Sequence, residues 1–223
     1  MPSVLLTIGG RPVYAEPGAV YFCAGMHVDA DGCPRAYHPD DVGLDRLRSA
    51  GTDGDWWGLV TDSRGQPIVQ GPADPAPGYY VSCTSLVDES RRRTDPRRYI
   101  DAAEVPYIAL PRRLWKEGGI RLGDVATIVD ERSRRVAHAI FADIAGDDEI
   151  GEGSIALAEA LGLPASPRSG GTARSELHYI VFPGSGDRRP LSREEIAERA
   201  AARFARWGGV QRVLARREDI AVA

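Results

Sequence analysis

The chain has 223 residues, of which 43% are hydrophobic and 27% are charged. This length suits one domain or one enlarged domain, and this composition excludes a chain that is disordered throughout. The formal net charge of −4 provides no basic surface for nucleic acid, and no apolar run of about 18 residues predicts a membrane helix. The first residues lack a basic segment before a long apolar stretch, so no signal peptide is expected. We therefore expect a cytoplasmic protein, or one exported by a non-classical route.

Short apolar runs separated by glycine and proline recur along the chain. Each has the length of a strand, contains β-branched or aromatic residues, and is bounded by turn residues. In chain order they are SVLLTI (3–8), WWGLV (56–60), PIVQ (67–70), YYVSCTSL (79–86), VPYIALP (105–111), DVATIVD (124–130), VAHAIFADI (136–144) and LHYIVFPG (177–184). Short strands at this spacing favour a barrel or a sandwich over alternating βαβ units.

Two segments are predicted to be helices. Residues 154–161 (SIALAEAL) are rich in helix formers, and Gly162 would end this helix. Residues 191–209 form the second, which Gly208 would end. Its capping box would be Ser192 with Glu195, and its core-facing residues would be Ile196, Ala200, Phe204 and Trp207. The charged segment 88–98 (DESRRRTDPRR) is predicted to be a solvated loop.

The motif content argues against several enzyme classes. There is no GxSxG motif, no P-loop and no GxGxxG, and no cysteine or serine has an obvious histidine partner in the sequence. Three cysteines make a poor disulfide framework, and Cys23 with Cys33 could either pair or stay reduced. Without a CxxC motif, and with four scattered histidines, a zinc site is not expected.

Asp29 and Asp31 lie in the short motif DADG (29–32), which could begin a calcium loop. An EF-hand is excluded because its fifth and twelfth positions would be Cys33 and Asp40. Two interpretations stay open. The motif could be a tight Asp-Gly turn after a strand, or it could form the acidic wall of a cleft.

Asp143 and Glu152 are the strongest candidates for catalysis. Asp143 lies near the end of an apolar strand, where partial desolvation would raise the pKa of its carboxyl. Glu152 precedes the helix that begins near Ser154, and the helix N-terminus would favour its charged form. Two carboxyls with separated pKa values suit the acid and the base of a glycosidase. The alternative is structural, with Asp143 ending a strand and Glu152 decorating a helix.

The stretch around these acids resembles glycoside hydrolase family 75, the fungal-type chitosanases. The resemblance rests on the turn ADIAG (142–146), on GEGS (151–154) with the alanine-rich helix that follows, and on GGT (170–172). The segments AGMHVDADG (24–32), YIDAAEVPYIALP (99–111) and LHYIVFPG (177–184) also resemble family segments in the same order. The likeness therefore covers about residues 21–186. Ala142 replaces a usual glycine, and His27 stands where an aspartate is common.

The resemblance implies an endo-acting glycosidase that inverts the anomeric centre without a metal or another cofactor. Its catalytic pair falls on Asp143, expected to be the acid, and Glu152, expected to be the base. The implied fold is mainly β (α+β), a compact double-psi-like β-barrel with a short helix after the catalytic turn and a C-terminal helix. We predict a single domain over residues 1–223, with the barrel core at about 21–186 and a C-terminal helical appendage at about 187–223. A monomer is expected.

The implied substrate is chitosan or a related amino-sugar polymer, which is a polycation at acidic pH. A cleft for it should combine carboxylates, hydroxyls and aromatic platforms. The expected substrate-binding residues are Asp29, Asp31, Tyr80, Ser82, Thr84, Asp147 and Ser154. Further candidates are Asp148, Glu149, Trp56, Trp57 and Tyr79. Each aromatic could instead belong to the core or the rim, and Ser82 and Thr84 could instead satisfy backbone groups.

Two other functions compete with this one. A peptidoglycan-cleaving enzyme on the same barrel, of the lytic, phage or interbacterial effector type, would need a single acid and would tolerate loss of Glu152. A non-catalytic carbohydrate-binding module would bind polysaccharide without turnover, and its two carboxyls would lie far apart or pair with arginine.

Overall fold

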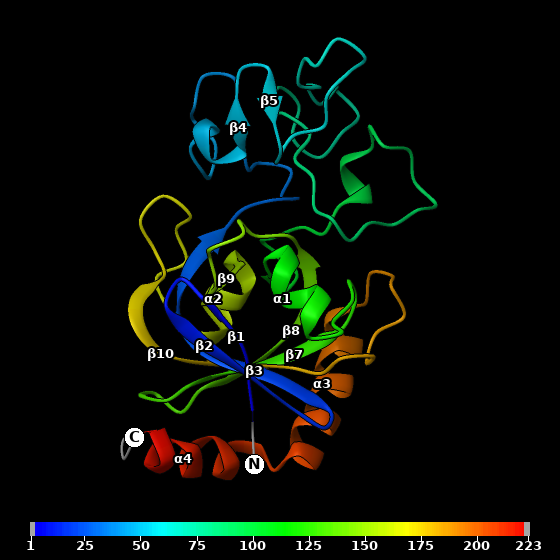
Figure 1. The fold of residues 1–223 in the computed structure, drawn as a ribbon. Coiled ribbons are helices and arrows are strands. Elements are labelled where there is room, and N and C mark those ends of the chain that lie inside the picture. The colour runs from blue at the N-terminus through cyan, green and yellow to red at the C-terminus, as the bar shows by residue number, and fades with distance from the viewer. Residues whose placement is uncertain (1–2, 221–223) are drawn as a thin grey trace.

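The centre of the protein is a closed β-barrel of six strands (Figure 1). The computed structural model describes residues 3–220, and the side chains of residues 3–215. The barrel strands are β3 (Ala19–Asp29), β10 (Thr172–Val181), β7 (Val125–Asp130), β8 (Val136–Asp143), β6 (Tyr107–Ala109) and β9 (Glu152–Ser154), and β9 pairs back onto β3. The pairs β6–β8 and β3–β9 are parallel, and the other four pairs are antiparallel. The expectation of a mainly β protein built on a compact barrel is confirmed.

Strand β3 has eleven residues and takes part in three pairings. Its first half pairs with β2 (Arg11–Glu16), which forms a hairpin with β1 (Ser3–Ile8). Its last three residues, from His27 to Asp29, pair with β9 and close the barrel. Strand β3 therefore carries Asp29 to the rim of the barrel, where the site described below lies.

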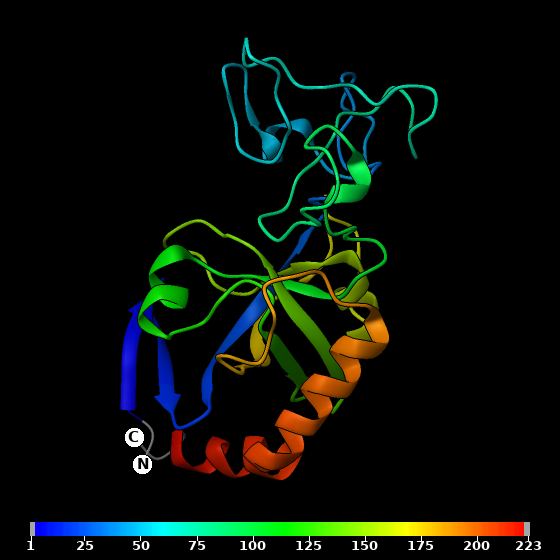
Figure 2. The ribbon, with the colours of Figure 1, turned by 90° about the vertical axis from the view of Figure 1, so that its right-hand side faces the viewer.

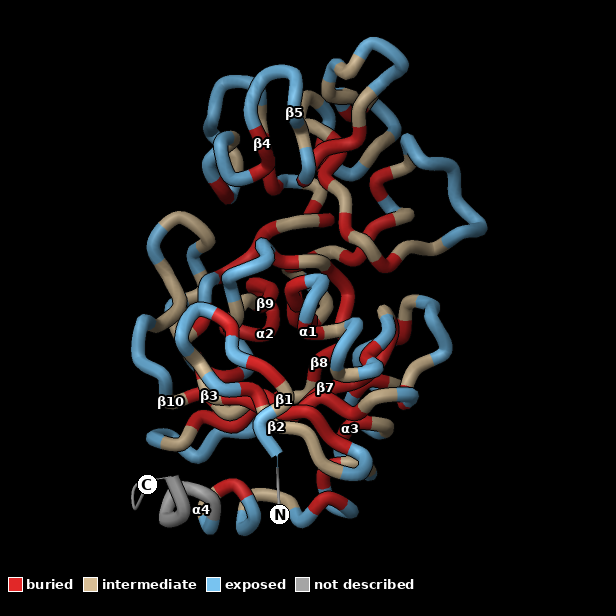
Figure 3. Tube along the Cα trace, in the orientation of Figure 1, coloured by how far each residue is buried: buried red, intermediate tan, exposed pale blue. Residues whose placement is uncertain are grey.

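Apolar side chains fill the barrel. All six residues of β7 are buried, and the rings of Phe22 and Tyr179 stack inside with their centroids 4.8 Å apart. Figure 3 shows the buried residues concentrated along the barrel strands. Continuous burial of this kind supplies most of the stability of a domain, so the barrel is a rigid base for groups on its rim.

Residues 30–105 leave the barrel after β3 and return just before β6, forming a loop-rich lobe at the top of Figure 1. Its regular elements are short: η1 (Leu47–Ala50), β4 (Gly51–Thr52), β5 (Asp55–Trp56) and η2 (Pro96–Arg98). A small separate cluster of Val60, Val81 and Tyr99 forms its own core. The apolar run at 79–86, expected to be a strand, makes only isolated bridges here.

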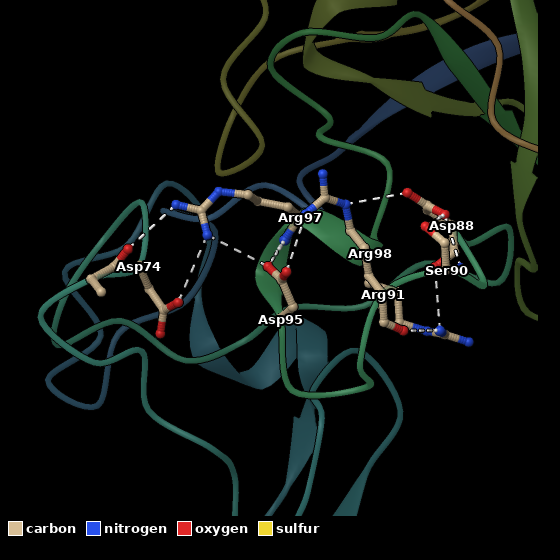
Figure 4. Close-up of polar contacts among 8 residues, drawn as sticks. Asp74, Asp88, Ser90, Arg91, Asp95, Arg97 and Arg98 are labelled. Carbon is tan, nitrogen blue, oxygen red and sulfur yellow. Dashed lines mark hydrogen bonds and ion pairs between the residues drawn. The ribbon is translucent and has the colours of Figure 1, made fainter.

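Charged contacts brace the exposed end of this lobe (Figure 4). The Arg91 guanidinium lies 3.2 Å from both Asp88 and Asp95, and Arg97 reaches Asp74 at 4.0 Å. Arg98 also donates to the backbone oxygen of Arg91, at 2.6 Å. Residues 89–94 are exposed, which confirms the predicted solvated loop over that part of 88–98, whereas Pro96 is buried at the start of η2. Each exposed ion pair contributes only about 0–1 kcal/mol, so this network mainly sets the conformation of the loop.

Within residues 3–220, four α-helices complete the fold: α1 (Arg112–Glu117), α2 (Ile155–Leu161), α3 (Arg193–Trp207) and α4 (Gly209–Ile220). The capping box of Ser192 with Glu195 and the buried face of α3 are confirmed. Figure 2 shows α3 running along the side of the barrel and α4 crossing beneath it. A separate helix α4 was not predicted, because Gly208 was expected to end the last helix. Gly208 and Gly209 have positive φ and separate α4 from α3. No helix in the described part of the chain is long and apolar enough to cross a membrane.

Candidate active site

An acidic cleft of about 780 Å³ lies where the lobe meets the rim of the barrel. Its walls combine lobe residues such as Tyr37 and Trp57 with barrel residues such as Ala109. Seven carboxylate side chains line it: Asp29, Asp31, Asp45, Asp143, Asp147, Glu149 and Glu152. Among the described residues, two arginines, Arg112 and Arg168, line the same cleft. The cleft is therefore rich in acidic groups, and each group that ionises makes its potential more negative, because low-dielectric walls focus the field of like charges.

Strand pairing places Asp143 and Glu152 on either side of one residue. Ala109 of β6 is in register with Asp143 of β8 and with Glu152 of β9. Neighbouring strands lie about 4.8 Å apart, so the Cα atoms of the two acids are separated by about 10 Å. The two acids lie in register beside the same residue and both line the cleft.

Hydrogen bonds hold the carboxyl of Asp143 in one orientation. Its Oδ1 accepts from the Ser85 backbone N–H at 3.0 Å, from Ser85 Oγ at 2.7 Å and from the Ile144 N–H at 2.8 Å. Burial, followed by the nearby Asp29 carboxylate, raises the pKa of Asp143 to about 7. These three donors oppose the rise, because they stabilise the charged form. The expected rise for Asp143 is confirmed.

Glu152 has a different environment from the one expected. It lies in strand β9, and Ser154 rather than Glu152 caps helix α2. Among the described residues no hydrogen bond or ion pair to its carboxylate is found. Burial and then the charges of Asp29 and Asp143 raise its pKa well above the usual range. The expectation of a lowered pKa is wrong, because the helix N-terminus does not reach the carboxylate and the neighbouring acids do.

Asp29 and Asp31 join this pair, so DADG forms part of a cleft wall as well as a turn. Asp29 Oδ1 accepts from the Asp31 N–H at 2.8 Å, and Asp31 Oδ1 accepts from the Tyr37 hydroxyl at 2.7 Å. One carboxylate oxygen each from Asp29, Asp31 and Asp143 lies within 4.8 Å of the other two. Such a cluster could hold a cation, either a divalent metal or an ammonium group.

Three predicted substrate-binding hydroxyls serve the fold instead, and those expectations are corrected. Ser154 is fully buried, and its Oγ bonds backbone groups of Tyr107, Val105 and Leu157. Thr84 Oγ1 donates to the Leu86 oxygen and accepts from the Ile100 N–H. Ser82 Oγ is buried, where it accepts from the Gly32 N–H and contacts the Gly58 oxygen. It also lies 3.4 Å from Asp31 Oδ1 and so helps to hold that carboxylate in place. Buried hydroxyls already paired to backbone have no donor free for a ligand.

The remaining predicted residues divide between the cleft and the lobe. Asp147 and Glu149 line the cleft on the turn that follows β8, whereas Asp148, Tyr79 and Tyr80 do not line it. Tyr80 is half-buried against the core, so its expected role as a platform is also corrected. Trp57 lines the cleft with 62% of its surface exposed, and its Nε1 donates to the Ser49 oxygen at 3.0 Å.

Several cleft residues were missed by sequence reasoning. Asp45 and Tyr37 come from the irregular part of the lobe, where no periodic pattern marks them. Arg168 joins the loop before β10 to the lobe, because its guanidinium donates to the backbone oxygens of Asp41, Gly43 and Asp45. Ser85, which holds Asp143, lies within the apolar run at 79–86, where no feature of the sequence sets it apart.

The carboxylate cluster makes stability depend on pH. Burial and mutual charge raise the pKa values of four acids: Asp29, Asp31, Asp143 and Glu152. In the unfolded chain these acids have pKa values near 4. At any pH between those values and the raised pKa values of the folded state, the folded protein binds more protons than the unfolded chain. Their contribution to the free energy of unfolding is fully present below about pH 4. It is lost as the pH rises through the raised pKa values, which for Asp143 means through about 7.

We therefore expect a higher melting temperature at pH 5 than at pH 8, measured by calorimetry. Asp31→Asn should reduce this difference, because it removes one of the interacting charges. Asp148→Asn, a carboxylate outside the cleft, should leave the difference unchanged. Equal melting temperatures at the two pH values, or an undiminished difference in Asp31→Asn, would contradict the prediction.

Comparison with known proteins identifies one family. The family model described as fungal chitosanase of glycosyl hydrolase group 75 matches residues 78–208, which is more than half of the chain. This range contains both Asp143 and Glu152, together with five of the six barrel strands. No curated protein matches the chain.

Proposed function

The chain belongs to the fungal chitosanases of glycosyl hydrolase group 75, and from this membership we propose that it hydrolyses β-1,4-linked glucosamine polymers. We propose that it cuts within the polymer, with inversion, using Asp143 and Glu152. The observation that carries this proposal is the placement of both acids beside Ala109 in one acidic cleft. The match of the family model over residues 78–208 confirms the resemblance to glycoside hydrolase family 75.

The charge of the cleft supports a cationic polymer as substrate. Seven carboxylates face two arginines, and an ammonium group on each sugar would offset their mutual repulsion. The three oxygens of Asp29, Asp31 and Asp143 could accept the three N–H groups of one ammonium. The exposed ring of Trp57 provides a flat apolar surface for a sugar face. An N-acetylated polymer would lack the charge, so deacetylated substrate should be preferred.

The hydrogen bonds favour a division of roles opposite to the one expected from sequence. A general acid must hold a proton, and Glu152 is poised to do so because neighbouring carboxylates oppose its ionisation and no donor stabilises its anion. A general base must be ionised, and Asp143 receives three hydrogen bonds that stabilise its anion. We therefore assign the acid to Glu152 and the base to Asp143.

In this reaction Glu152 protonates the glycosidic oxygen while the bond from that oxygen to the anomeric carbon breaks. Asp143 takes a proton from a water that attacks the anomeric carbon on the opposite face, so the configuration inverts. Inverting enzymes separate their carboxyls by roughly 6.5–9.5 Å to accommodate this water. A Cα separation of about 10 Å across one intervening strand is compatible with that spacing.

The bound substrate would also adjust the charge state of the pair. An ammonium group near Asp143 favours its anion and lowers its pKa from about 7. The base would thus become competent when a cationic polymer enters the cleft. A neutral polymer would not lower the pKa of Asp143, which adds a second reason for preferring chitosan.

The proposed function is tested by incubating the protein with chitosan, chitin and peptidoglycan sacculi in parallel. We expect new reducing ends from chitosan, a falling polymer length from the first minutes, and α-anomers first by NMR. Addition of a chelator should not change the rate if the acidic cluster binds ammonium rather than a metal. Release of anhydro-muramyl products from sacculi, with no cleavage of chitosan, would replace this proposal with the peptidoglycan-cleaving alternative.

Ser85→Ala should separate the two assignments of acid and base. The variant loses the Oγ donor to Asp143 Oδ1, so the pKa of Asp143 should rise by about one unit. If Asp143 is the base, the acidic limb of the pH–rate profile moves to higher pH. A shift of the alkaline limb instead would return the acid role to Asp143. Chitosan titrates identically in both assays, so its own pKa cancels, and Ser85→Thr should restore the parent profile.

A further inference from the structure

Cys23 and His178 face each other on the outside of the barrel, away from the acidic cleft. Cys23 of β3 is in register with His178 of β10, and residues directly opposite in antiparallel strands point to the same face. The Cys23 Sγ lies 3.1 Å from His178 Nδ1. Neither residue lines the cleft, so this contact plays no part in the proposed hydrolysis.

A carboxylate completes a chain of three groups. Glu131 follows β7, and its Oε2 lies 3.1 Å from His178 Nε2. Its position is fixed by the backbone, because the Glu131 N–H donates to the Glu176 oxygen at 3.0 Å. A carboxylate accepts hydrogen bonds, so Nε2 carries the ring proton and the lone pair of Nδ1 faces the thiol. This order of nucleophile, base and orienting acid is the one that activates hydroxyl and thiol nucleophiles.

The thiol is not ionised in its resting state. Burial, and then the Glu131 charge, raise the pKa of Cys23 to about 11, although Arg11 opposes this rise. Burial likewise raises the pKa values of the other two thiols, Cys33 and Cys83, to about 12. All three cysteines are free, so the pairing of Cys23 with Cys33 does not occur in this structure. What distinguishes Cys23 is an imidazole nitrogen in contact with its sulfur, whereas the hydrogen-bonding partner of the Cys33 thiol is the Asp101 carboxylate.

The surroundings limit what could reach this thiol. Aromatic and aliphatic side chains of β2, of the barrel strands β3 and β10 and of the C-terminal helices surround it: Tyr14, Tyr21, Ile180, Trp207 and Val213. They leave a cavity of about 20 Å³, which is room for roughly one water-sized molecule. A sugar or a peptide does not fit, whereas a two-atom electrophile such as hydrogen peroxide comes close to that size.

We propose that Cys23, His178 and Glu131 form a peroxide-reactive thiol site on the outer face of the barrel. His178 Nδ1 takes the thiol proton as the sulfur attacks one peroxide oxygen, so an S–O bond forms and the O–O bond breaks. The imidazolium then gives that proton to the leaving hydroxide, which becomes water. The sulfur is oxidised by two electrons to a sulfenic acid, and the peroxide is reduced by the same two electrons. Glu131 orients the ring and stabilises the imidazolium.

The site is tested by comparing the three cysteines within one protein. The folded protein is exposed to hydrogen peroxide, catalase stops the reaction, and denaturant with dimedone then labels every sulfenic acid for peptide mass spectrometry. General-base assistance should add about 10²-fold or more to the rate at Cys23.

His178→Ala should remove this advantage and bring Cys23 to within about tenfold of Cys83. Glu131→Gln, which keeps the shape of the side chain, should lower the rate at Cys23 without affecting Cys83. Melting temperatures of both variants report whether the barrel still folds. Parent protein that oxidises at similar rates at all three cysteines, or an unchanged Cys23 rate in Glu131→Gln and His178→Ala, would overturn the proposal.

The cleft provides an independent readout. Cys23→Ser should abolish labelling at residue 23 and leave chitosan hydrolysis at the parent rate, because the thiol lies outside the cleft. Failure of the peroxide reaction therefore leaves the proposed glycosidase function unaffected. Failure of chitosan hydrolysis likewise leaves the proposal of a peroxide-reactive thiol unaffected.

Discussion

Glu152→Gln should lower the release of reducing ends from chitosan by about 10²–10⁴-fold, because positioned proton transfer contributes about that much. The substitution keeps the size of a half-buried side chain in β9, so the fold should be retained. Removing one acid from the cluster should even raise the melting temperature near pH 8, since burial and neighbouring charge oppose ionisation there. Loss of activity in a protein that melts no earlier than the parent would isolate a chemical role for this carboxyl.

The role of Glu152 as the acid is tested with a substrate that needs no proton. In a glucosamine oligomer that carries dinitrophenol at its reducing end, the dinitrophenol departs as a stable anion. Glu152→Gln should therefore hydrolyse this substrate at close to the parent rate. Asp148→Asn serves as the matched control, because Asp148 is an acid on the turn before β9 but outside the cleft, and it should behave like the parent on both substrates. If Glu152→Gln cleaves chitosan normally, neither the acid role nor the base role of Glu152 survives. The single-acid mechanism of the peptidoglycan alternative would then gain support.

Local patterns predicted the regular elements that depend on neighbours in sequence. The capping box and buried stripe of α3 lie within four residues of their partners, and the predicted helix at 154–161 begins and ends at its cap residues. The strands β7 and β8 were also visible as apolar runs bounded by turns. The barrel that joins them depends on pairings such as β3 with β10, between segments about 150 residues apart, which no local pattern contains.

The two candidate acids show where sequence reasoning ends. Their spacing along the chain was visible, but the strand that separates them in space is β6, from a segment more than thirty residues upstream. The pKa of Glu152 was mispredicted for the same reason. A helix N-terminus is a local feature, whereas the charges of Asp29 and Asp143 that oppose ionisation arrive through tertiary structure.

Hydroxyl groups were also misassigned because their partners are remote. Ser154 was expected to bind substrate, yet its Oγ bonds the backbone of β6 and caps α2 at once. The same limit conceals the contact between Cys23 and His178, which lie 155 residues apart in sequence. A family resemblance can point to a site, but the partners that set the chemistry of each group come from the folded chain.

Asp143→Asn should also reduce chitosan hydrolysis by about 10²–10⁴-fold, because an amide cannot take the proton from the attacking water. The amide oxygen can still accept from the Ser85 N–H and from Ser85 Oγ, so the side chain should keep its position. Azide needs no general base, and it should restore cleavage of the dinitrophenyl substrate in this variant. Asp148→Asn should show no such dependence on azide.

The product of that rescue separates the two assignments once more. Attack by azide on the face opposite a β-linked leaving group should yield an α-glycosyl azide, detectable by NMR, if Asp143 is the base of an inverting reaction. Glu152→Gln should give no such product, because its base is intact and only protonation of the leaving group is impaired. Formation of the azide adduct in Glu152→Gln, but not in Asp143→Asn, would reverse the roles while keeping the pair. The three hydrogen bonds to Asp143 Oδ1 predict the first outcome, because they stabilise a carboxylate that must be charged before it can act.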